Sequence, residues 1–372
     1  MKKCSLAELK PGMILDRTIY TDSGMTLMDA GTVLTEGHIQ ILESRFGQGY
    51  LSVFVHSTAL EDVLEDVFRQ HNGVKEDKAL LDPRYITLYQ EVMEDMRSLM
   101  EHQRRNHVLD LELIGAFIAD KKLDELCDGA RAVIQIHSME REGDYLLHHS
   151  LHVAILAGLM GRWLHWPRAD RERLLLAGLL HDIGKLMVPS EILDKKGGLT
   201  PEERAVMQTH PEHGYEMLLQ SGLKNETDIL SGVLQHHERL DGSGYPRNLM
   251  SDKIYTYGRI LAILDVYDAM AARHCYAQRH SPFEIFDVLS ADIMDGKLDA
   301  EYGILFIKKM CHSLVGTWVR LTDGQKAKIV YIDQSRTNAL PIVETEHGDF
   351  WDIATKKDVD IQEILTSDEI TA

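Results

Sequence analysis

A five-residue stretch, His181-Asp182-Ile183-Gly184-Lys185, follows an apolar run of helical character at residues 174–180. An adjacent histidine and aspartate offer one metal both a neutral nitrogen and a charged oxygen, and the second carboxylate oxygen can reach a neighbouring metal. Lys185 follows about one turn later as a point charge suited to phosphate. The same residues could instead cap and solvate a helix end, so this stretch alone leaves both interpretations open.

More residues with metal-binding chemistry lie on both sides of this stretch. His149 lies in an amphipathic helical pattern, and His210 lies in Thr-His-Pro-Glu-His-Gly. His236 and His237 are adjacent and begin the run His-His-Glu-Arg-Leu-Asp-Gly-Ser-Gly-Tyr-Pro. Asp265 lies in Ile-Leu-Asp-Val-Tyr-Asp-Ala. Together these residues favour a metal site over a solvated helix end.

The ordered motifs resemble the HD-GYP family, the cyclic di-GMP phosphodiesterases of the HD hydrolase superfamily. The resemblance runs from about residue 144 to 313 and covers His-Asp-x-Gly-Lys, Lys-Gly-Gly-Leu-Thr-Pro-Glu-Glu, His-Pro-x-x-Gly, the full Gly-Tyr-Pro signature and Asp-Val-Tyr-Asp-Ala. It implies a mainly α fold, with an HD-type helical bundle as the catalytic domain. It also implies hydrolysis of cyclic di-GMP to pGpG, with further hydrolysis to GMP and activity on cyclic GMP-AMP left open.

The resemblance implies two divalent transition metals per chain. One metal is implied at His149, His181, Asp182 and Asp265, and the other at Asp182, His210, His236 and His237. Asp182 would bridge the metals, which would activate a hydroxide and neutralise phosphoryl charge. Nitrogen-rich, thiolate-free donors suit Fe, Mn, Co, Ni or Zn, and the family pattern favours iron or manganese. Some members bind a third metal through a glutamate, but this chain has Tyr145 at that position, so two metals are expected.

Asp265 supports a metal site independently of the resemblance. It lies in an apolar helical stretch, where an ionised carboxylate is costly unless it is paired or bound to metal. The alternative is one wet helix face, shared with Asp268. We expect Asp268 to orient a histidine ligand rather than to bind metal. His148, His152 and His213 are expected to be structural or solvent-facing.

The expected substrate contacts depart in part from the family pattern. Lys185 and Tyr245 are the expected contacts to the phosphates and guanine of the substrate. Family members read Arg-Pro-Tyr-Arg or Arg-Pro-Tyr-Lys where this chain reads His-Cys-Tyr-Ala at residues 274–277, which leaves Arg273 and His274 as candidate contacts. A lost charge-assisted contact weakens binding by roughly 1.5–3 kcal/mol. This departure favours an alternative function, a weakly active nucleotide sensor or a partner of diguanylate cyclases that binds them through the Gly-Tyr-Pro loop.

Charge and cysteine usage narrow the class of protein. The net charge is −19, from 40 basic and 59 acidic residues, which argues against general DNA or RNA binding because such binding rests on Lys and Arg. The four cysteines form no CxxC pair and fit a reducing compartment. The N-terminus does not read as a signal peptide, and the apolar run at residues 151–166 is too short to span a bilayer. We expect a cytoplasmic protein, and a homodimer is compatible with its helical segments.

The sequence pattern predicts four regions: a β-rich accessory domain at 1–60, a helical connecting region at 61–140, the catalytic domain at 141–313, and a β subdomain at 314–372. Within the first region, shared-face apolar residues predict a helix at about 35–45 beside short strands, hence a small α+β domain. In the last region, alternating residues on both sides of Asp323-Gly324 predict a hairpin.

Overall fold

The computed structural model describes residues 2–11, 13–15, 17–20, 26–28, 32, 34–46, 52–56, 83–106, 109–119, 121–127, 132–134, 136, 145–195, 197–271, 280–333, 339–365 and 369–370. The chain divides into two compact units, Met1–Glu76 and Asp77–Ala372.

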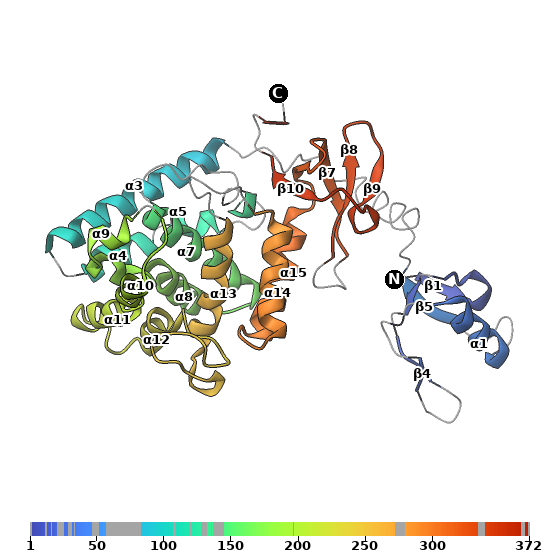
Figure 1. Cartoon of the computed structure of the whole chain (residues 1–372), viewed down its shortest axis with the longest axis horizontal. Coiled ribbons are helices and arrows are strands. Elements are labelled where there is room, and N and C mark those ends of the chain that lie inside the picture. Colours follow the sequence, from blue (N-terminus) through green and yellow to red (C-terminus); the bar gives the residue numbers. More distant parts are fainter. Residues whose placement is uncertain are drawn as a thin grey trace. The chain divides into compact units, whose positions relative to one another are not determined.

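The first unit is a small α+β domain (Figure 1). Its three-stranded antiparallel sheet has the order β1 (Lys2–Ser5), β5 (Ser52–His56), β2 (Ile14–Leu15). β3 (Ile19–Tyr20) pairs separately with β4 (Thr26–Met28), and α1 (Glu36–Phe46) is the helix predicted at 35–45. The core of this unit includes the fully buried side chains of Leu6, Leu15, Leu34 and Leu42.

The second unit is built mainly from helices (Figure 1). They are α3 (Pro83–Asn106), α4 (Leu111–Ala119), α5 (Lys121–Leu126), α7 (Tyr145–Trp163), α8 (Arg168–Leu180), α9 (Ser190–Leu193), α10 (Pro201–Met207), α11 (His210–Gln220), α12 (Thr227–Gln235), α13 (Thr256–Ala271), α14 (Pro282–Met294) and α15 (Ala300–Leu314).

The α7 helix lies deep inside the bundle. Fourteen of its nineteen residues are buried, so it is apolar on nearly every face, as expected of a helix inside a bundle. It packs against α8, α13, α15 and α3. Several helix starts follow from local sequence: Thr200 and Glu203 form a capping box at α10, and Ser281 and Glu284 form another at α14.

A five-stranded antiparallel sheet follows α15 and completes this unit. Its order is β10 (Ile361–Ile364), β6 (Trp318–Leu321), β7 (Lys326–Tyr331), β8 (Ile342–Thr345), β9 (Phe350–Asp352). Gly324 turns the β6–β7 hairpin with a φ of +88°, which favours glycine. Val319, Ile329 and Val343 are buried in the same core as the helices, so the sheet and the bundle share one hydrophobic interior.

The mainly α fold, with small β regions near both ends and the predicted hairpin, is confirmed. The contact division has one boundary, after Glu76, and the predicted boundaries at 60, 140 and 313 stay predictions. Residues 57–82, which include the end of the predicted accessory domain and the start of the predicted connecting region, lie outside the described residues. Within the described part of the chain, every helix is too short or too polar to cross a bilayer.

Candidate metal centre

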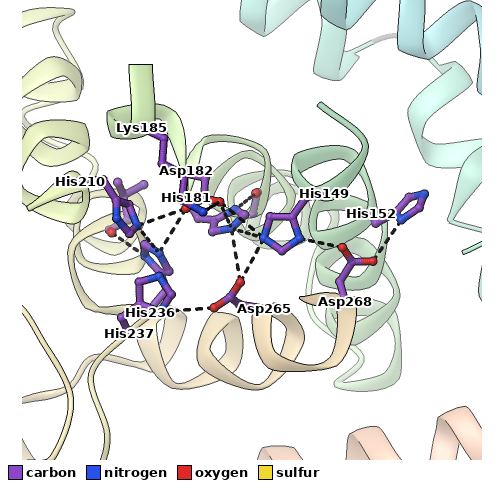
Figure 2. A network of polar contacts seen from close by, with 12 residues as sticks. His149, His152, His181, Asp182, Lys185, His210, His236, His237, Asp265 and Asp268 are labelled. Carbon is purple, nitrogen blue, oxygen red and sulfur yellow. Dashed lines mark hydrogen bonds and ion pairs between the residues drawn. The ribbon is translucent and has the colours of Figure 1, made fainter. Parts of the chain in front are cut away.

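Helix termini and two helix interiors bring the seven predicted metal ligands together (Figure 2). The contributing residues are His149 within α7, His181 and Asp182 just after α8, His210 at the start of α11, His236 and His237 just after α12, and Asp265 within α13. Six of the seven are buried, and the His237 side chain is 16% exposed.

Close backbone packing sets the distance between two of these elements. The 3-10 helix η2 (Ile183–Met187) packs against α11, and Gly184 makes the approach possible. A Cβ atom at Gly184 would collide with the carbonyl oxygen of His210 and the backbone nitrogen of Gly214. The glycine of the His-Asp-x-Gly-Lys motif therefore allows Asp182 and His210 to meet.

The candidate ligands form two groups. Within each group, the donor atoms lie within 4.8 Å of one another. One group is Asp182, His210, His236 and His237, and the other is His149, His181 and Asp265. Asp182 lies between them (Figure 2). Its Oδ1 is 3.2 Å from His210 Nε2, and its Oδ2 is 3.4 Å from His181 Nε2 and 3.5 Å from His149 Nε2. This carboxylate can therefore serve both groups, one oxygen to each.

Hydrogen bonds to backbone carbonyls orient three of the imidazoles in the same way. The Nδ1 atoms of His181, His210 and His236 lie 2.7–2.8 Å from the carbonyl oxygens of residues three positions earlier. A carbonyl only accepts, so each Nδ1 carries the proton and donates. Each Nε2 lone pair is thereby directed at the cluster, which is the tautomer that a metal requires.

The donor atoms that face the centre of the cluster are arranged to bind a cation rather than to form hydrogen bonds with one another. His149 Nε2 lies 3.2 Å from His181 Nε2, and His210 Nε2 lies 3.3 Å from His236 Nε2. Two lone pairs at this distance repel unless a proton or metal lies near both. Asp182 Oδ1 is also buried and makes no hydrogen bond within the described chain. These donors fit divalent transition metals, and neither group contains a thiolate.

The electrostatics keep most of the donors in their metal-binding protonation state. Burial lowers the pKa of His181 to about 3 and also lowers the pKa values of His210 and His237. Burial opposes ionisation of Asp182, but Lys185 and the neighbouring imidazoles outweigh it and hold its pKa well below the usual range. Neutral imidazoles and an ionised carboxylate therefore coexist at neutral pH.

His149 behaves differently from the other imidazoles. Burial disfavours its protonated form, yet hydrogen bonds to Asp265 and Asp268 outweigh burial and raise its pKa to about 9. Its ring also stacks on Tyr145, with ring centroids 5.6 Å apart and planes 7° apart. Tyr145 therefore supports His149 by packing at the position where some family members carry a glutamate.

Two of the four predicted substrate contacts lie beside the candidate ligands. Lys185 lies at the edge of the cluster with its Nζ 2.5 Å from Asp182 Oδ2. The Tyr245 ring stacks on His237, with centroids 4.5 Å apart, so it borders the second ligand group. Arg273 and His274 lie outside the described residues.

A buried glutamate that sequence reasoning gave no role shapes the loop carrying Tyr245. The Glu238 carboxylate accepts hydrogen bonds from the backbone nitrogens of Arg247, at 2.7 Å, and Leu249, at 2.9 Å. A Cβ at Gly244 would lie 2.5 Å from the carbonyl oxygen of His237, so glycine permits the tight fold of this loop. The position of Glu238 directly after two histidine ligands was the available signal.

The role expected of Asp268 agrees with its position, since Asp268 Oδ2 lies 2.7 Å from His149 Nδ1. His152, expected to be structural or solvent-facing, is fully buried and contacts Asp268 Oδ1 through its Nδ1 at 3.1 Å. The i, i+3 spacing of His149 and His152 on one helix was the signal that both face the same carboxylate.

Comparisons with known proteins match the part of the chain that carries the candidate ligands. Residues 127–302 match the family model described as the HD domain. The chain is 34% identical over 194 residues to the cyclic di-GMP phosphodiesterase PA4108 of Pseudomonas aeruginosa, covering 52% of this chain and 46% of the relative. It is 33% identical over 208 residues to the 3'3'-cGAMP-specific phosphodiesterase 2 of Vibrio cholerae, covering 56% of this chain and 39% of the relative. The chain thus spans less than half of the length of either relative.

A solved structure of Bd1817, an HDG"Y"P protein from Bdellovibrio bacteriovorus, aligns with a TM-score of 0.49 and 15% identity, covering 82% of this chain and 97% of that chain. Residues 127–302 therefore contain an HD domain, and the Gly-Tyr-Pro motif noted in the sequence lies within it, at residues 244–246.

Proposed function

We propose that the chain is a metal-dependent phosphodiesterase that hydrolyses cyclic di-GMP to pGpG, and that GMP forms only if pGpG is hydrolysed further. The observation that carries this proposal is the position of Asp182 between two groups of donors, with one carboxylate oxygen toward each. The names of the relatives support cyclic di-GMP as substrate and 3'3'-cGAMP as the second candidate.

Two divalent metals, with iron or manganese favoured, are proposed at the two groups. When bound, such a centre activates water at neutral pH and neutralises charge on the phosphoryl oxygens. Hydrolysis adds the oxygen of water to phosphorus and breaks the bond from phosphorus to the 3' oxygen of the ribose, which takes up a proton. The product is a linear dinucleotide with a 5' phosphate. Because water is the nucleophile, this reaction requires no covalent intermediate on the protein.

The protein groups hold the reactants and the donor atoms in place. Backbone carbonyls fix three imidazoles with Nε2 inward, and Asp182 serves both donor groups. Lys185 carries a positive charge at the edge of the cluster, where it can bind a phosphate oxygen of the substrate. Tyr245 presents an aromatic ring beside His237, a surface on which guanine can stack.

The second candidate is a metal-containing nucleotide sensor with weak hydrolysis, which binds diguanylate cyclases through the loop of residues 241–250. The specific observation in its favour is His-Cys-Tyr-Ala at residues 274–277, where the family pattern has two cations.

The two candidates are separated by measuring product formation from cyclic di-GMP and from 3'3'-cGAMP with Mn²⁺-loaded protein, and by measuring equilibrium binding of the same nucleotides. The enzyme proposal expects pGpG to accumulate with many turnovers per chain, and expects His181→Ala to abolish both turnover and binding of one metal. Micromolar nucleotide binding without turnover would favour the sensor.

A further inference from the structure

A line of buried polar contacts leads from His149 away from the two donor groups (Figure 2). Asp268 on α13 contacts two histidines of α7, His149 Nδ1 through Oδ2 at 2.7 Å and His152 Nδ1 through Oδ1 at 3.1 Å. All three side chains are at most 2% exposed. Asp268 therefore holds a candidate metal ligand on one side and His152 on the other.

The line continues into a helix that precedes the HD domain. Tyr89 belongs to α3, which lies entirely before residues 127–302, and its side chain is 1% exposed. Its hydroxyl oxygen lies 2.7 Å from His152 Nε2 and 3.1 Å from His148 Nδ1. One hydroxyl thus links α3 to two histidines of α7.

The chemistry of these groups fixes the direction of each hydrogen bond. An ionised carboxylate only accepts, so His149 and His152 both donate from Nδ1 to Asp268. His152 Nε2 is then an acceptor and receives the proton of the Tyr89 hydroxyl, whose oxygen accepts from His148 Nδ1. On His149, donation from Nδ1 leaves Nε2 as the atom directed at His181 and Asp265, 3.2 and 3.1 Å away. Every contact along the line from His149 through Asp268 and His152 to Tyr89 and His148 pairs one donor with one acceptor.

We propose that Tyr89 and His152 are positioning residues for the metal centre and act through Asp268 on the ring orientation and tautomer of His149. The helix α3, which is outside the segment matched by the family model, would therefore be part of the support of this centre. This inference rests on the proposed function, because it requires His149 to bind metal. Hydrogen-bonded partners of a ligating imidazole typically change metal affinity 10- to 100-fold when they are removed.

The same helix offers a matched control. Tyr85 lies one turn before Tyr89, is 5% exposed, and donates its hydroxyl hydrogen to the carbonyl oxygen of Leu126 at 2.8 Å. Tyr85→Phe and Tyr89→Phe each remove one buried hydroxyl from α3 and keep the aromatic ring. Only Tyr89→Phe removes the hydrogen bond to His152.

The test is equilibrium dialysis of the full chain, stripped with chelator, against Mn²⁺, with both site affinities fitted. We expect Tyr89→Phe to weaken one of the two sites about tenfold, and Asp268→Asn to weaken the same site by about 10- to 100-fold. Tyr85→Phe should leave both unchanged, because its hydroxyl contacts neither histidine. Adding Tyr89→Phe to Asp268→Asn should cause little further loss, because the hydroxyl acts through that carboxylate.

A spectroscopic measurement separates positioning from general packing. With Co²⁺ in place of Mn²⁺, Tyr89→Phe should alter the visible absorption of the bound ion while Tyr85→Phe leaves it unchanged. If the unmutated chain binds two metals and Tyr89→Phe binds both with unchanged affinity and absorption, the inference about Tyr89 and His152 is overturned and the proposed function stands. If the unmutated chain binds no metal at these residues, the proposed function fails together with the inference.

Discussion

Lys185 and Asp182 form an ion pair in which Lys185 Nζ lies 2.5 Å from Asp182 Oδ2. The Lys185 side chain is 18% exposed and Asp182 is almost fully buried, so the ammonium group stands between the buried cluster and the surface. The residue that sequence reasoning assigned to phosphate is thus tied to the carboxylate that serves both donor groups.

Replacing Lys185 should weaken substrate binding and spare the metals. Lys185→Gln is expected to raise KM for cyclic di-GMP by roughly 10- to 150-fold, which corresponds to the loss of a contact of about 1.5–3 kcal/mol. The measurement is steady-state hydrolysis with metal content determined in the same samples. Lys195→Gln is the control, because Lys195 pairs with Glu203 away from the cluster. Loss of metal from the Lys185 variant would contradict this role.

Removing Glu238 should destabilise the fold through the loop of residues 241–250. Glu238→Ala deprives two backbone N–H groups of a charged acceptor, so we expect the free energy of unfolding to fall by about 2–4 kcal/mol. Urea denaturation measures the change. Glu212→Ala removes an exposed carboxylate near Arg247 and should change stability by less than about 0.5 kcal/mol. Equal effects of the two substitutions would show that Glu238 does not hold the loop.

Metal affinity should depend on pH through His149. Its pKa is raised from 6.5 to about 9, so in chelator-treated protein the bound proton stabilises the fold fully below pH 6.5, and this contribution is lost as pH rises through 9. A metal at Nε2 must displace that proton. Mn²⁺ affinity at one site should therefore keep rising between pH 7 and 8.5, by at most about tenfold per unit. Competition dialysis at several pH values measures this dependence. A Mn²⁺ affinity that does not change above pH 7 would argue against the prediction.

Restoring the family cations should strengthen nucleotide binding. His274→Arg combined with Ala277→Arg is expected to tighten binding of cyclic di-GMP by at least roughly tenfold, because each new cation can make a charge-assisted contact. Isothermal titration calorimetry measures the dissociation constant. Gln278→Arg adds a charge at a neighbouring position and is the control. Equal tightening by both variants would indicate nonspecific attraction.

The sequence predicted those features of the site and fold for which only a few residue types are suitable. The seven candidate ligands lie in motifs whose order is diagnostic, and Asp265 stood out because a carboxylate in an apolar helix needs a partner. The hairpin at Asp323-Gly324 and the helix at 35–45 followed from local periodicity and turn chemistry. These features depend on neighbours in the chain, so local patterns predict them.

Local sequence patterns could not predict the contacts between distant segments of the chain. Tyr89 meets His152 across 63 positions of sequence, and nothing in the local sequence of α3 distinguishes Tyr89 from Tyr85. The adjacent His181 and Asp182 indicated only that this carboxylate could reach two metals. The residues that it faces could not be read from the sequence pattern, because the two groups come from five helical segments. Tertiary packing decides these pairings.

The first measurement to make is anaerobic hydrolysis of cyclic di-GMP by chain loaded separately with iron and with manganese, with metal counted per chain and products resolved by chromatography. Asp182→Asn serves as the paired variant, since it removes the charge shared by both donor groups while keeping the side-chain shape. We expect about two metals per chain, sustained formation of pGpG or GMP, and loss of both in the variant. Full turnover by Asp182→Asn, or turnover by protein that holds no metal, would contradict a two-metal phosphodiesterase.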